Sequence, residues 1–567
     1  MRRADPITTE VIRHALETIA EEMGTAVRRT SLSTVVKDMR DYSCALFDAS
    51  GRLLATAVDI PTLLASMGPA LRACIDKWQA QIFPGDVFLT NDPYLGAAHK
   101  SDINIFVPVF DREERLIGFV GVITHHADWG GRVPGTCSAD NRSVFEEGVT
   151  YRAIKLHDRG VANRAVYDII EANVRHPRQN RGDLRAQLAA AHAGERRLSR
   201  LVERYGADLV RDTIDDLISY CAERTRQEIS LLPDGTYSAD GYLDDDGLRP
   251  DHHVRIAVTV TVAGDRMLFD FEGTDAQMDG GMNIPTATTR SAVHYAVKCL
   301  LPDDIPFNEG SIEPVEIRAS EGTVVNPLFP AAVGDRHLAS QRLADVLTRA
   351  LTDVAPERTS AGWFVGWPVF ICECYSPKTG DGVVFLAQVA GGAGATRAHD
   401  GADALDVHMA NCAIIPAETV ESTYPLRVER YELQSDNGGA GRYRGGLGIR
   451  ADYRNISDQP LSCLAQAEQW TPEFAPPGLD GGLPGSPAVL ALVRDGVDDV
   501  LLPGKGALVL QPGDSVSLRA GGGGGCGAPG QRDSEAVLAD VRSGRVSADA
   551  AYRVYGAELP QIGPSST

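Results

Sequence analysis

The first thirty residues of the chain have the apolar spacing of an amphipathic helix. Large apolar side chains recur there at three- and four-residue intervals, up to Val27. Thr8 or Thr9 can cap the start of this helix, just after Pro6, and two arginines followed by a threonine and Ser31 mark its end. The pattern therefore predicts a long helix with one buried face.

Shorter runs of apolar residues follow and predict strands. A turn sequence at 48–51 separates two such runs, at 42–48 and 53–57, and predicts a β-hairpin. Further strands are expected at 86–90, 103–110 and 116–126. Strand, turn and strand recur here without long intervening helices, so we expect a mainly antiparallel sheet.

The rest of the chain changes between helical and strand patterns over longer stretches. Its successive regions are a helical stretch at 162–231, alternating strands at 235–271, helices at 292–301 and 340–354, short strands with glycine turns at 426–518, and two short helices within 534–555. The strand-rich stretch at 426–518 predicts a β-barrel or a β-sandwich.

Together these patterns predict an α+β, multidomain fold with mostly antiparallel sheets, helical segments and a C-terminal β-rich domain. At ~150 residues per domain, 567 residues have room for three or four domains. The predicted units are an N-terminal α+β region with the candidate metal site at 1–160, a helical segment at 161–232, a central α+β domain at 233–425, a β-rich domain at 426–530 and a helical tail at 531–567.

The charge balance narrows the range of partners. The chain has 55 Lys and Arg against 77 Asp and Glu, a net charge of −22, and a pI near 5.0. A field of this sign repels phosphate backbones and anionic lipids, so we expect neither nucleic acid nor a membrane as a partner. No apolar run reaches the ~18 residues of a membrane span, and no secretory signal opens the sequence. The ten cysteines show no C-x-x-C spacing, which fits a cytoplasmic protein with reduced thiols.

Histidines and aspartates gather in the first quarter of the chain. His99 and Asp102 lie in a loop before a predicted strand, and His125, His126 and Asp128 lie at the end of another strand. Imidazole and carboxylate groups suit Zn or Mn, and ligands from separate elements leave coordination positions open. Neighbouring strand residues point to opposite faces, so spacing alone does not choose between the two adjacent histidines. The alternative is that the first histidine caps a loop and the pair bonds to backbone.

Other motifs favour a metal site over competing chemistries. Asp41, at the entry to the strand predicted at 42–48, is a further candidate carboxylate, with a solvated strand start as the alternative. The glycine runs at 391–395 and 521–525 match neither a P-loop nor a dinucleotide-binding unit, so close backbone approach is their expected role. No G-x-S-x-G motif occurs, which argues against a serine hydrolase.

Several longer motifs are specific enough to suggest a family. They include D-P-I-T-T-E-V at 5–11, D-Y-S-C-A-L-F-D at 41–48, N-D-P-Y at 91–94, H-H-A-D-W-G-G at 125–131, E-E-G at 146–148, S-Q-R at 340–342 and G-G-A-G-R-Y-R-G-G at 438–446. In these motifs the chain resembles the hydantoinase B/5-oxoprolinase family. That family includes the B-type subunit of ATP-dependent hydantoinases and lactamases and the α-type subunit of acetone and acetophenone carboxylases.

The resemblance implies a divalent metal, Zn or Mn, held by Asp41, His99, Asp102 and His125, with His126 as the alternative histidine. It also implies that ATP binds to a partner, the hydantoinase A-type subunit, rather than to this chain. A hetero-oligomer such as (αβ)2 is therefore expected, which agrees with the missing phosphate-binding loop.

The function implied by the resemblance is that of a metal-dependent catalytic subunit. The partner would phosphorylate a cyclic amide (a hydantoin, oxoproline or lactam), and this chain would hydrolyse it. Asp128 and His126 are the candidate catalytic groups, Asp128 as a general base or as a group that orients a histidine. The alternatives are the α-type subunit of an ATP-dependent ketone carboxylase, a non-catalytic scaffold subunit and a stand-alone metal amidohydrolase.

The chain departs from the family pattern at three places. The stretch 59–65 reads D-I-P-T-L-L-A, where family members often have H-I-P-V-H-L-G, so two histidines are missing. The stretch 362–367 is rich in aromatic residues, and Cys526 stands where an aromatic residue is common. These differences bear on which substrate the chain accepts more than on whether it binds a metal.

Overall fold

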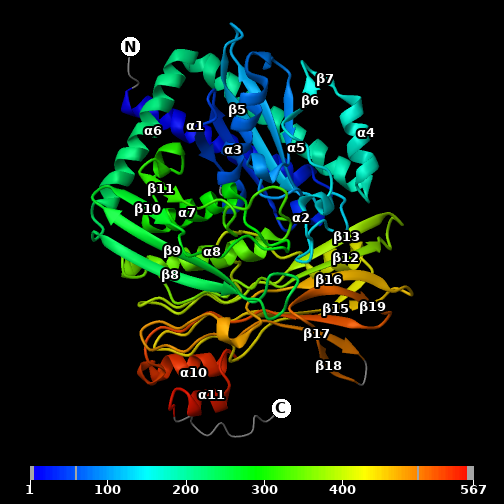
Figure 1. The fold of residues 1–567 in the computed structure, drawn as a ribbon, viewed down its shortest axis with the longest axis vertical. Coiled ribbons are helices and arrows are strands. Elements are labelled where there is room, and N and C mark those ends of the chain that lie inside the picture. The colour runs from blue at the N-terminus through cyan, green and yellow to red at the C-terminus, as the bar shows by residue number, and fades with distance from the viewer. Residues whose placement is uncertain (1–4, 58–59, 495–496, 558–567) are drawn as a thin grey trace.

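A computed structural model describes residues 5–57, 60–494 and 497–557 of the chain. These residues form three successive regions along the longest axis of the molecule: an N-terminal sheet with its helices, a central region of helices with a smaller sheet, and a C-terminal pair of sheets that carries the last two helices (Figure 1). The prediction of an α+β, multidomain fold with mostly antiparallel sheets is confirmed. Asp59, at the start of the altered 59–65 stretch, lies outside the described residues.

The N-terminal sheet has seven strands in the order β2-β1-β5-β4-β3-β6-β7, each antiparallel to its neighbours. Its elements are β1 (Tyr42–Asp48), β2 (Leu53–Thr56), β3 (Val87–Thr90), β4 (Asp102–Phe110), β5 (Leu116–His125), β6 (Ile154–Asp158) and β7 (Val161–Ala162), with helices α1 (Pro6–Thr30), α2 (Thr34–Lys37), α3 (Pro61–Trp78) and α5 (Pro177–Tyr205) around it. Cys44 and Leu46 pack in one core with α1 and α5, whereas Ala45 and Phe47 pack in another with α3. All of β1 is buried because helices cover both faces of the sheet.

Helix α1 begins slightly earlier than the sequence predicted. Asp5 caps it, rather than Thr8 or Thr9, because its Oδ1 accepts hydrogen bonds of 3.1 Å from the backbone nitrogens of Ile7 and Thr8. Pro6 is therefore the first residue of the helix and not the residue just outside it. Both positions are favourable, since a carboxylate satisfies the open N–H groups and proline has no N–H to leave unpaired.

The predicted helical stretch packs mainly in the core of the N-terminal sheet and consists of α4 (Arg164–Asn173), α5 and α6 (Ala207–Ile229). The central region contains the second sheet, of order β11-β10-β9-β8, and its elements are β8 (Gly235–Leu243), β9 (Val254–Ala263), β10 (Arg266–Asp270), α7 (Thr286–Leu300), β11 (Val315–Arg318) and α8 (Arg336–Ala350). Val293 of α7 and Leu343 of α8 share one core with Val258 of β9. Helix α8 starts four residues before the predicted 340, which places Arg336 and His337 in its first turn.

The C-terminal strands form a β-sandwich of two open sheets, with orders β13-β12-β16-β19 and β14-β15-β20-β17-β18. The elements are β12 (Val369–Tyr375), β13 (Gly382–Gln388), α9 (Ala417–Thr423), β14 (Leu426–Leu433), β15 (Ile449–Asn455), β16 (Leu461–Gln466), β17 (Val489–Arg494), β18 (Val497–Leu501), β19 (Lys505–Leu510) and β20 (Ser515–Arg519). The rings of Phe370 and Tyr453, one from each sheet, stack at 6.0 Å in the shared core. Strands β12 and β16 pair across the boundary predicted at 425/426, so this boundary does not separate the sheets.

The glycine runs lie where backbones pack directly against one another. A Cβ atom at Gly392 would come within 1.9 Å of the carbonyl oxygen of Gly446, and one at Gly523 within 2.0 Å of that of Ala393. Only glycine permits so close an approach, which explains these runs without a phosphate ligand. Within the described residues, no helix combines the length and the apolar character needed to cross a bilayer.

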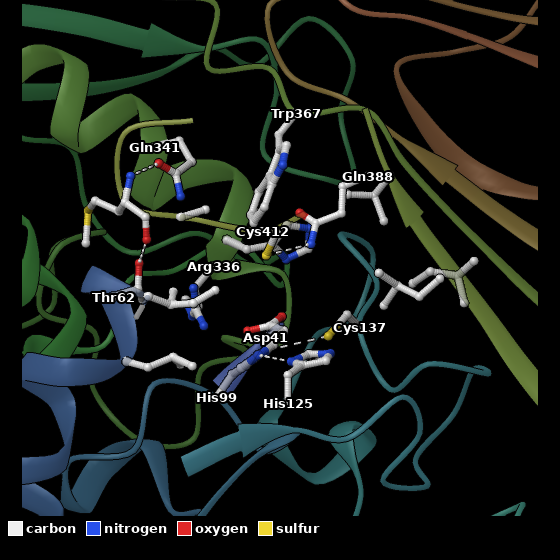
Figure 2. A pocket seen from close by; sticks show the side chains of 18 residues that line it. Asp41, Thr62, His99, His125, Cys137, Arg336, Gln341, Trp367, Gln388 and Cys412 are labelled. Atoms are coloured by element: carbon white, nitrogen blue, oxygen red, sulfur yellow. Dashed lines mark hydrogen bonds between the residues drawn. The ribbon is translucent and has the colours of Figure 1, made fainter. Parts of the chain in front are cut away.

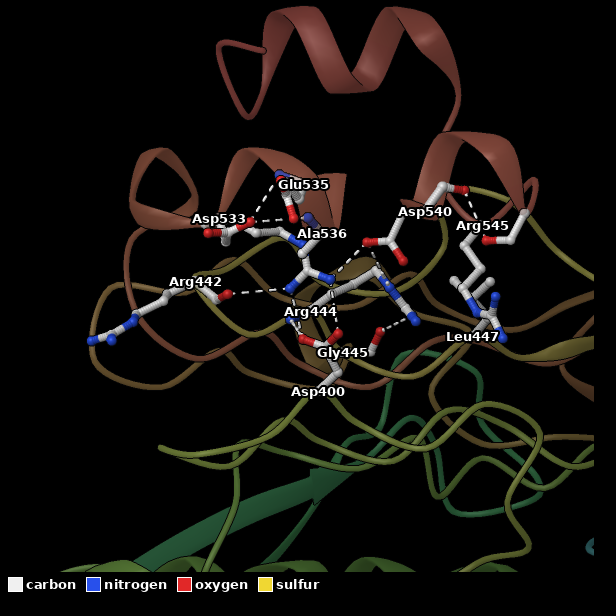
Figure 3. A network of polar contacts seen from close by, with 12 residues as sticks. Asp400, Arg442, Arg444, Gly445, Leu447, Asp533, Glu535, Ala536, Asp540 and Arg545 are labelled. Carbon is white, nitrogen blue, oxygen red and sulfur yellow. Dashed lines mark hydrogen bonds and ion pairs between the residues drawn. The ribbon is translucent and has the colours of Figure 1, made fainter. Parts of the chain in front are cut away.

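The last two helices, α10 (Ser534–Arg542) and α11 (Ala548–Arg553), are tied to this glycine-rich layer by buried charges. Arg532 binds both oxygens of Asp400, at 2.7 and 2.8 Å, and also Oδ2 of Asp540 at 2.7 Å. Arg444 lies beside the same carboxylates, as Figure 3 shows. The network connects α10 to residues more than a hundred positions earlier in the chain.

Candidate metal centre

Three neighbouring strands of the N-terminal sheet place the candidate ligands at one end of the sheet. Asp102 is the first residue of β4 and pairs in register with His125, the last residue of β5. Asp41 directly precedes β1, on the other side of β5, and its carbonyl accepts a hydrogen bond from the backbone nitrogen of His125. His99 lies in the loop before β4, where its carbonyl closes a turn with the nitrogen of Asp102. Antiparallel pairing therefore brings Asp41, Asp102 and His125 together, and the turn before β4 adds His99.

Three side-chain atoms of this group form a compact triangle. Nε2 of His99 lies 3.1 Å from Nδ1 of His125 and 3.1 Å from Oδ1 of Asp102, and the last two atoms lie 3.0 Å apart. The two imidazole rings stack at 4.9 Å. Ligand atoms at about 2.0–2.2 Å from one Zn ion lie roughly 3 Å from one another, so the triangle has the dimensions of one coordination shell. Among the described residues, these three are the group of His, Cys, Asp and Glu side chains with this property.

The hydrogen bonding of the histidine rings also suits a metal site. Nδ1 of His99 donates to the carbonyl of Gly334 at 2.8 Å, which leaves the electron pair of Nε2 free. The atom of His125 that belongs to the triangle is Nδ1, while Nε2 of the same ring is buried with no hydrogen-bond partner. Two histidines and a carboxylate are ligands that both Zn and Mn accept.

Burial and charge shift the pKa of each group. Burial lowers the pKa of His99 to about 4, so this imidazole is neutral near pH 7 and can bind a cation. Burial opposes ionisation of Asp102, but His99, His125 and Arg336 outweigh it and hold the pKa of this carboxyl well below its usual range. Burial also lowers the pKa of His125, yet the hydrogen bond to Asp102 and the charge of Asp41 outweigh it and raise that pKa. Burial raises the pKa of Asp41 to about 6.

Two groups farther out hold the ligands in position. Arg336, in the first turn of α8, donates from Nη2 to Oδ2 of Asp102 at 2.9 Å. Oε1 of Glu147 accepts hydrogen bonds from the nitrogens of Val333 and Gly334, at 2.8 and 2.7 Å, and so fixes the carbonyl that orients His99. Neither residue was predicted as part of the site, although Glu147 belongs to the E-E-G motif.

The two histidines of the triangle, together with Asp41, line a cavity of about 50 Å³ between the N-terminal sheet and the C-terminal sandwich, and Asp102 lies behind them. Figure 2 shows Asp41, His99 and His125 on one side of this cavity, with Trp367 and Gln388 across from them. The aromatic stretch predicted to matter for the substrate thus contributes Trp367 to the lining. The remaining lining is largely apolar and comes from five parts of the chain: Ile60, Thr62, Leu63, Cys137, Arg336, His337, Gln341, Val369, Ile371, Leu386, Met409, Ala410 and Cys412.

The structure places the two candidate catalytic residues outside this lining. His126 points to the opposite face of the sheet from His125, and its Nε2 lies 3.1 Å from Oε1 of Gln187. Asp128 accepts hydrogen bonds from the backbone nitrogens of three residues and, at 2.8 Å, from Nη1 of Arg175. Both side chains are buried and engaged in bonds that stabilise the fold, so the geometry does not support a catalytic role for either.

Comparison with known proteins agrees with this architecture. Residues 5–529 match the model of a family described as Hydantoinase B/oxoprolinase. Because the match covers nearly the whole chain, it places this protein in the class of the hydantoinase and oxoprolinase enzymes. The chain belongs to the hydantoinase B/oxoprolinase family, which confirms the resemblance seen in its motifs.

Two sequence relatives differ in how much of their own length this chain matches. A candidate B-type subunit of a D-/L-hydantoinase from a Pseudomonas strain is 34% identical over 582 residues, which are 99% of this chain and 96% of the relative. The 5-oxoprolinase 1 of Arabidopsis thaliana is 30% identical over 553 residues, covering 92% of this chain but 42% of the relative. The chain thus corresponds to a whole subunit in the first case and to less than half of a polypeptide in the second.

Two solved structures have the same fold. The ATP-dependent caprolactamase from Pseudomonas jessenii superposes with a TM-score of 0.91 and 31% identity, covering 99% of this chain and 98% of that chain. An acetone carboxylase in its nucleotide-free state superposes with a TM-score of 0.86 and 21% identity, covering 97% of this chain and 79% of that chain. The second likeness concerns the fold alone.

Proposed function

We propose that this chain is the metal-dependent catalytic subunit of an ATP-dependent complex that hydrolyses an uncharged cyclic amide. The observation that carries the proposal is the triangle of His99, Asp102 and His125, whose two histidines line a largely apolar cavity. The three side chains, with Asp41 beside them, would hold Zn or Mn. The bound ion would supply Lewis-acid stabilisation of charge that develops on the substrate oxygen.

The lining of the cavity supports an uncharged substrate. Among the described residues that line it, Arg336 is the one lysine or arginine, and its guanidinium already binds Asp102. A substrate with its own carboxylate, such as 5-oxoproline, would find no lysine in the lining and no arginine other than the one already bound to Asp102, so burial of that charge would be poorly compensated. An aliphatic ring, in contrast, matches the apolar walls: Ile60, Leu63, Val369, Ile371, Leu386 and Met409.

One polar group in the lining favours an amide over a ketone. The side-chain nitrogen of Gln388 donates to Sγ of Cys412 at 3.3 Å, and its Oε1 is buried without a partner. The ring nitrogen of the phosphorylated amide gains an N–H when it takes up a proton after the attack of water, and Oε1 of Gln388 can accept a hydrogen bond from that N–H, whereas a ketone has no nitrogen. Leaving a buried acceptor unpaired costs about 1–3 kcal/mol, so the difference would act as discrimination.

Activation by ATP is proposed to occur on a partner of the hydantoinase A type. This chain has no P-loop or dinucleotide-binding motif, and the related caprolactamase is ATP-dependent by name. Phosphorylation of the amide oxygen makes the carbon attached to it more electrophilic, and so more open to attack by water, than it is in the unactivated amide. We propose a hetero-oligomer such as (αβ)2 that works in the cytoplasm, where ATP is available.

A ketone carboxylase of the α-type is the second candidate. The aromatic wall formed by Trp367 favours it, because an apolar ketone could pack there. The two candidates differ in their need for bicarbonate, which carboxylation consumes and hydrolysis does not. A non-catalytic scaffold would need no stoichiometric metal, and a stand-alone amidohydrolase would need no ATP.

The test is to co-express the chain with an A-type subunit and assay the purified complex with ATP. The substrates are a seven-membered lactam, a hydantoin, 5-oxoproline and acetophenone, each with and without bicarbonate. We expect ATP-dependent opening of the lactam, one bound divalent ion per chain, and loss of both in His99→Ala. His14→Ala, at a histidine whose side chain is 65% exposed, is the control. Full activity and metal content in His99→Ala would contradict the proposal.

A further inference from the structure

We propose that His337 is the general base of the reaction, which moves protons between the attacking water and the leaving nitrogen. The inference rests on the proposed function and assigns the proton chemistry that His126 and Asp128 are not placed to perform. His337 lines the same cavity as His99 and His125, but it comes from the first turn of α8 rather than from the sheet.

The two ring nitrogens of His337 have different surroundings. Nδ1 lies 3.4 Å from Oδ1 of Asp335, while Nε2 is buried and has no hydrogen-bond partner. A carboxylate beside Nδ1 favours the tautomer with the proton on that nitrogen, which leaves the electron pair of Nε2 free. An imidazole with a carboxyl group beside one nitrogen and an unpartnered second nitrogen, on a residue that lines the cavity, has the arrangement that general-base catalysis requires.

Both neighbours of this imidazole are themselves held in place. Oδ1 of Asp335 accepts a hydrogen bond of 2.7 Å from Nε2 of Gln466, and its backbone nitrogen donates to the carbonyl of Gly281 at 2.9 Å. The indole of Trp367 meets the edge of the His337 ring at a centroid distance of 5.7 Å and an interplanar angle of 72°. Trp367 has a φ of 42°, a left-handed conformation that a bulky residue adopts only when its surroundings impose it. The ring of His337 is therefore oriented from two sides.

The protons balance with one base. The oxygen of water forms a bond to the carbon of the phosphorylated amide, while Nε2 of His337 takes one proton and passes it to the ring nitrogen of the substrate. The added hydroxyl then gives its remaining proton to Nε2 as its C=O bond forms. The C–N bond breaks with its electron pair on nitrogen, and Nε2 delivers the second proton there. The products are a free amine and an acyl phosphate, which a second water hydrolyses to carboxylate and phosphate.

Loss of a general base should change the kinetics differently from loss of a metal ligand, so substitutions can tell His337 apart from the residues that hold the metal. In the complex with the A-type subunit, His337→Ala should keep its full metal content and its KM for the lactam, while kcat falls about 10²–10⁴-fold. ADP formation on the partner should continue, because phosphorylation precedes the step that needs the base. Added imidazole should restore part of the rate in His337→Ala and none in His99→Ala.

Rescue by imidazole is the decisive measurement, because a merely structural loss would not respond to a small base. Asp335→Asn is the second variant, expected to lower kcat less than His337→Ala and to leave metal content unchanged, and His14→Ala is the control. Wild-type kcat in His337→Ala, or loss of metal from it, would overturn the role of His337 while the proposed function stands. A wild-type complex with no turnover would overturn both.

Discussion

Arg336 donates a hydrogen bond from Nη2 to Oδ2 of Asp102 over 2.9 Å, although 234 residues separate the two in the sequence. The other oxygen of this carboxylate lies 3.0 Å from Nδ1 of His125. The arginine therefore holds one carboxylate oxygen so that the other faces the histidines. Partners of this kind orient ligands and tune the affinity of a metal site.

Arg336→Gln should weaken metal binding by about 10–100-fold, because the glutamine cannot hold Asp102 by a charged bond. Metal affinity would be measured by competition with a chromogenic chelator on the purified chain. Arg349→Gln is the matched control, since Arg349 lies on the same helix and donates to the carbonyl of Asp240 at 3.1 Å, away from the cavity. Equal affinities in the two variants would show that Arg336 does not act on the site.

Glu147→Ala should lower both stability and metal affinity, because it leaves the nitrogens of Val333 and Gly334 buried without an acceptor. Each unpaired group costs about 1–3 kcal/mol of unfolding free energy. Glu147→Gln should restore most of the loss, since the amide oxygen can accept the same two bonds. Urea unfolding and metal titration would be compared with Glu146→Ala, a change at the neighbouring, more exposed glutamate. A Gln variant as impaired as Ala would refute this positioning role.

Asp128→Asn should destabilise the chain without emptying the metal site. The carboxylate accepts a charged hydrogen bond from Arg175 and three backbone bonds, so loss of its charge should cost about 1.5–3 kcal/mol of unfolding free energy. Asp102→Asn should instead abolish metal binding. Metal content per folded chain, together with thermal unfolding, distinguishes the two variants. An Asp128→Asn variant without bound metal would show that Asp128 contributes to the metal site.

Arg532→Met should release the last two helices from the molecule. Its guanidinium side chain is 3% exposed and joins the partly exposed Asp400 to the buried Asp540, and removal of one partner from a buried pair such as Arg532 and Asp540 costs about 3–5 kcal/mol. We expect faster proteolytic cleavage within 531–557, with metal content unchanged. Arg542→Met, at an exposed arginine on α10, is the control. Equal cleavage rates in the two variants would show that the charge network does not hold these helices.

Much of the fold followed from local patterns in the sequence. The hairpin of β1 and β2 could be predicted from a turn sequence between two apolar runs, and the helical stretch from apolar residues at helical spacing. The cap of α1 was predicted wrongly because three polar residues near Pro6 compete for one position, and Asp5 won by reaching two backbone nitrogens. The start of α8 was missed because its first two residues are polar, although Arg336 is buried and His337 is partly buried among other parts of the chain.

The amino-acid sequence by itself determined the helices, the antiparallel strands, the family and the residue types available to bind a metal. The metal itself stays a prediction. Only the tertiary structure decided which of two adjacent histidines faces Asp102 and His99, and that Asp128 supports the fold instead of the cavity. It also brought Arg336, His337 and Glu147 to the site from distant segments. The reason is physical: spacing along a chain sets local conformation, whereas a site is a set of distances between side chains that exist only once sheets and helices have packed.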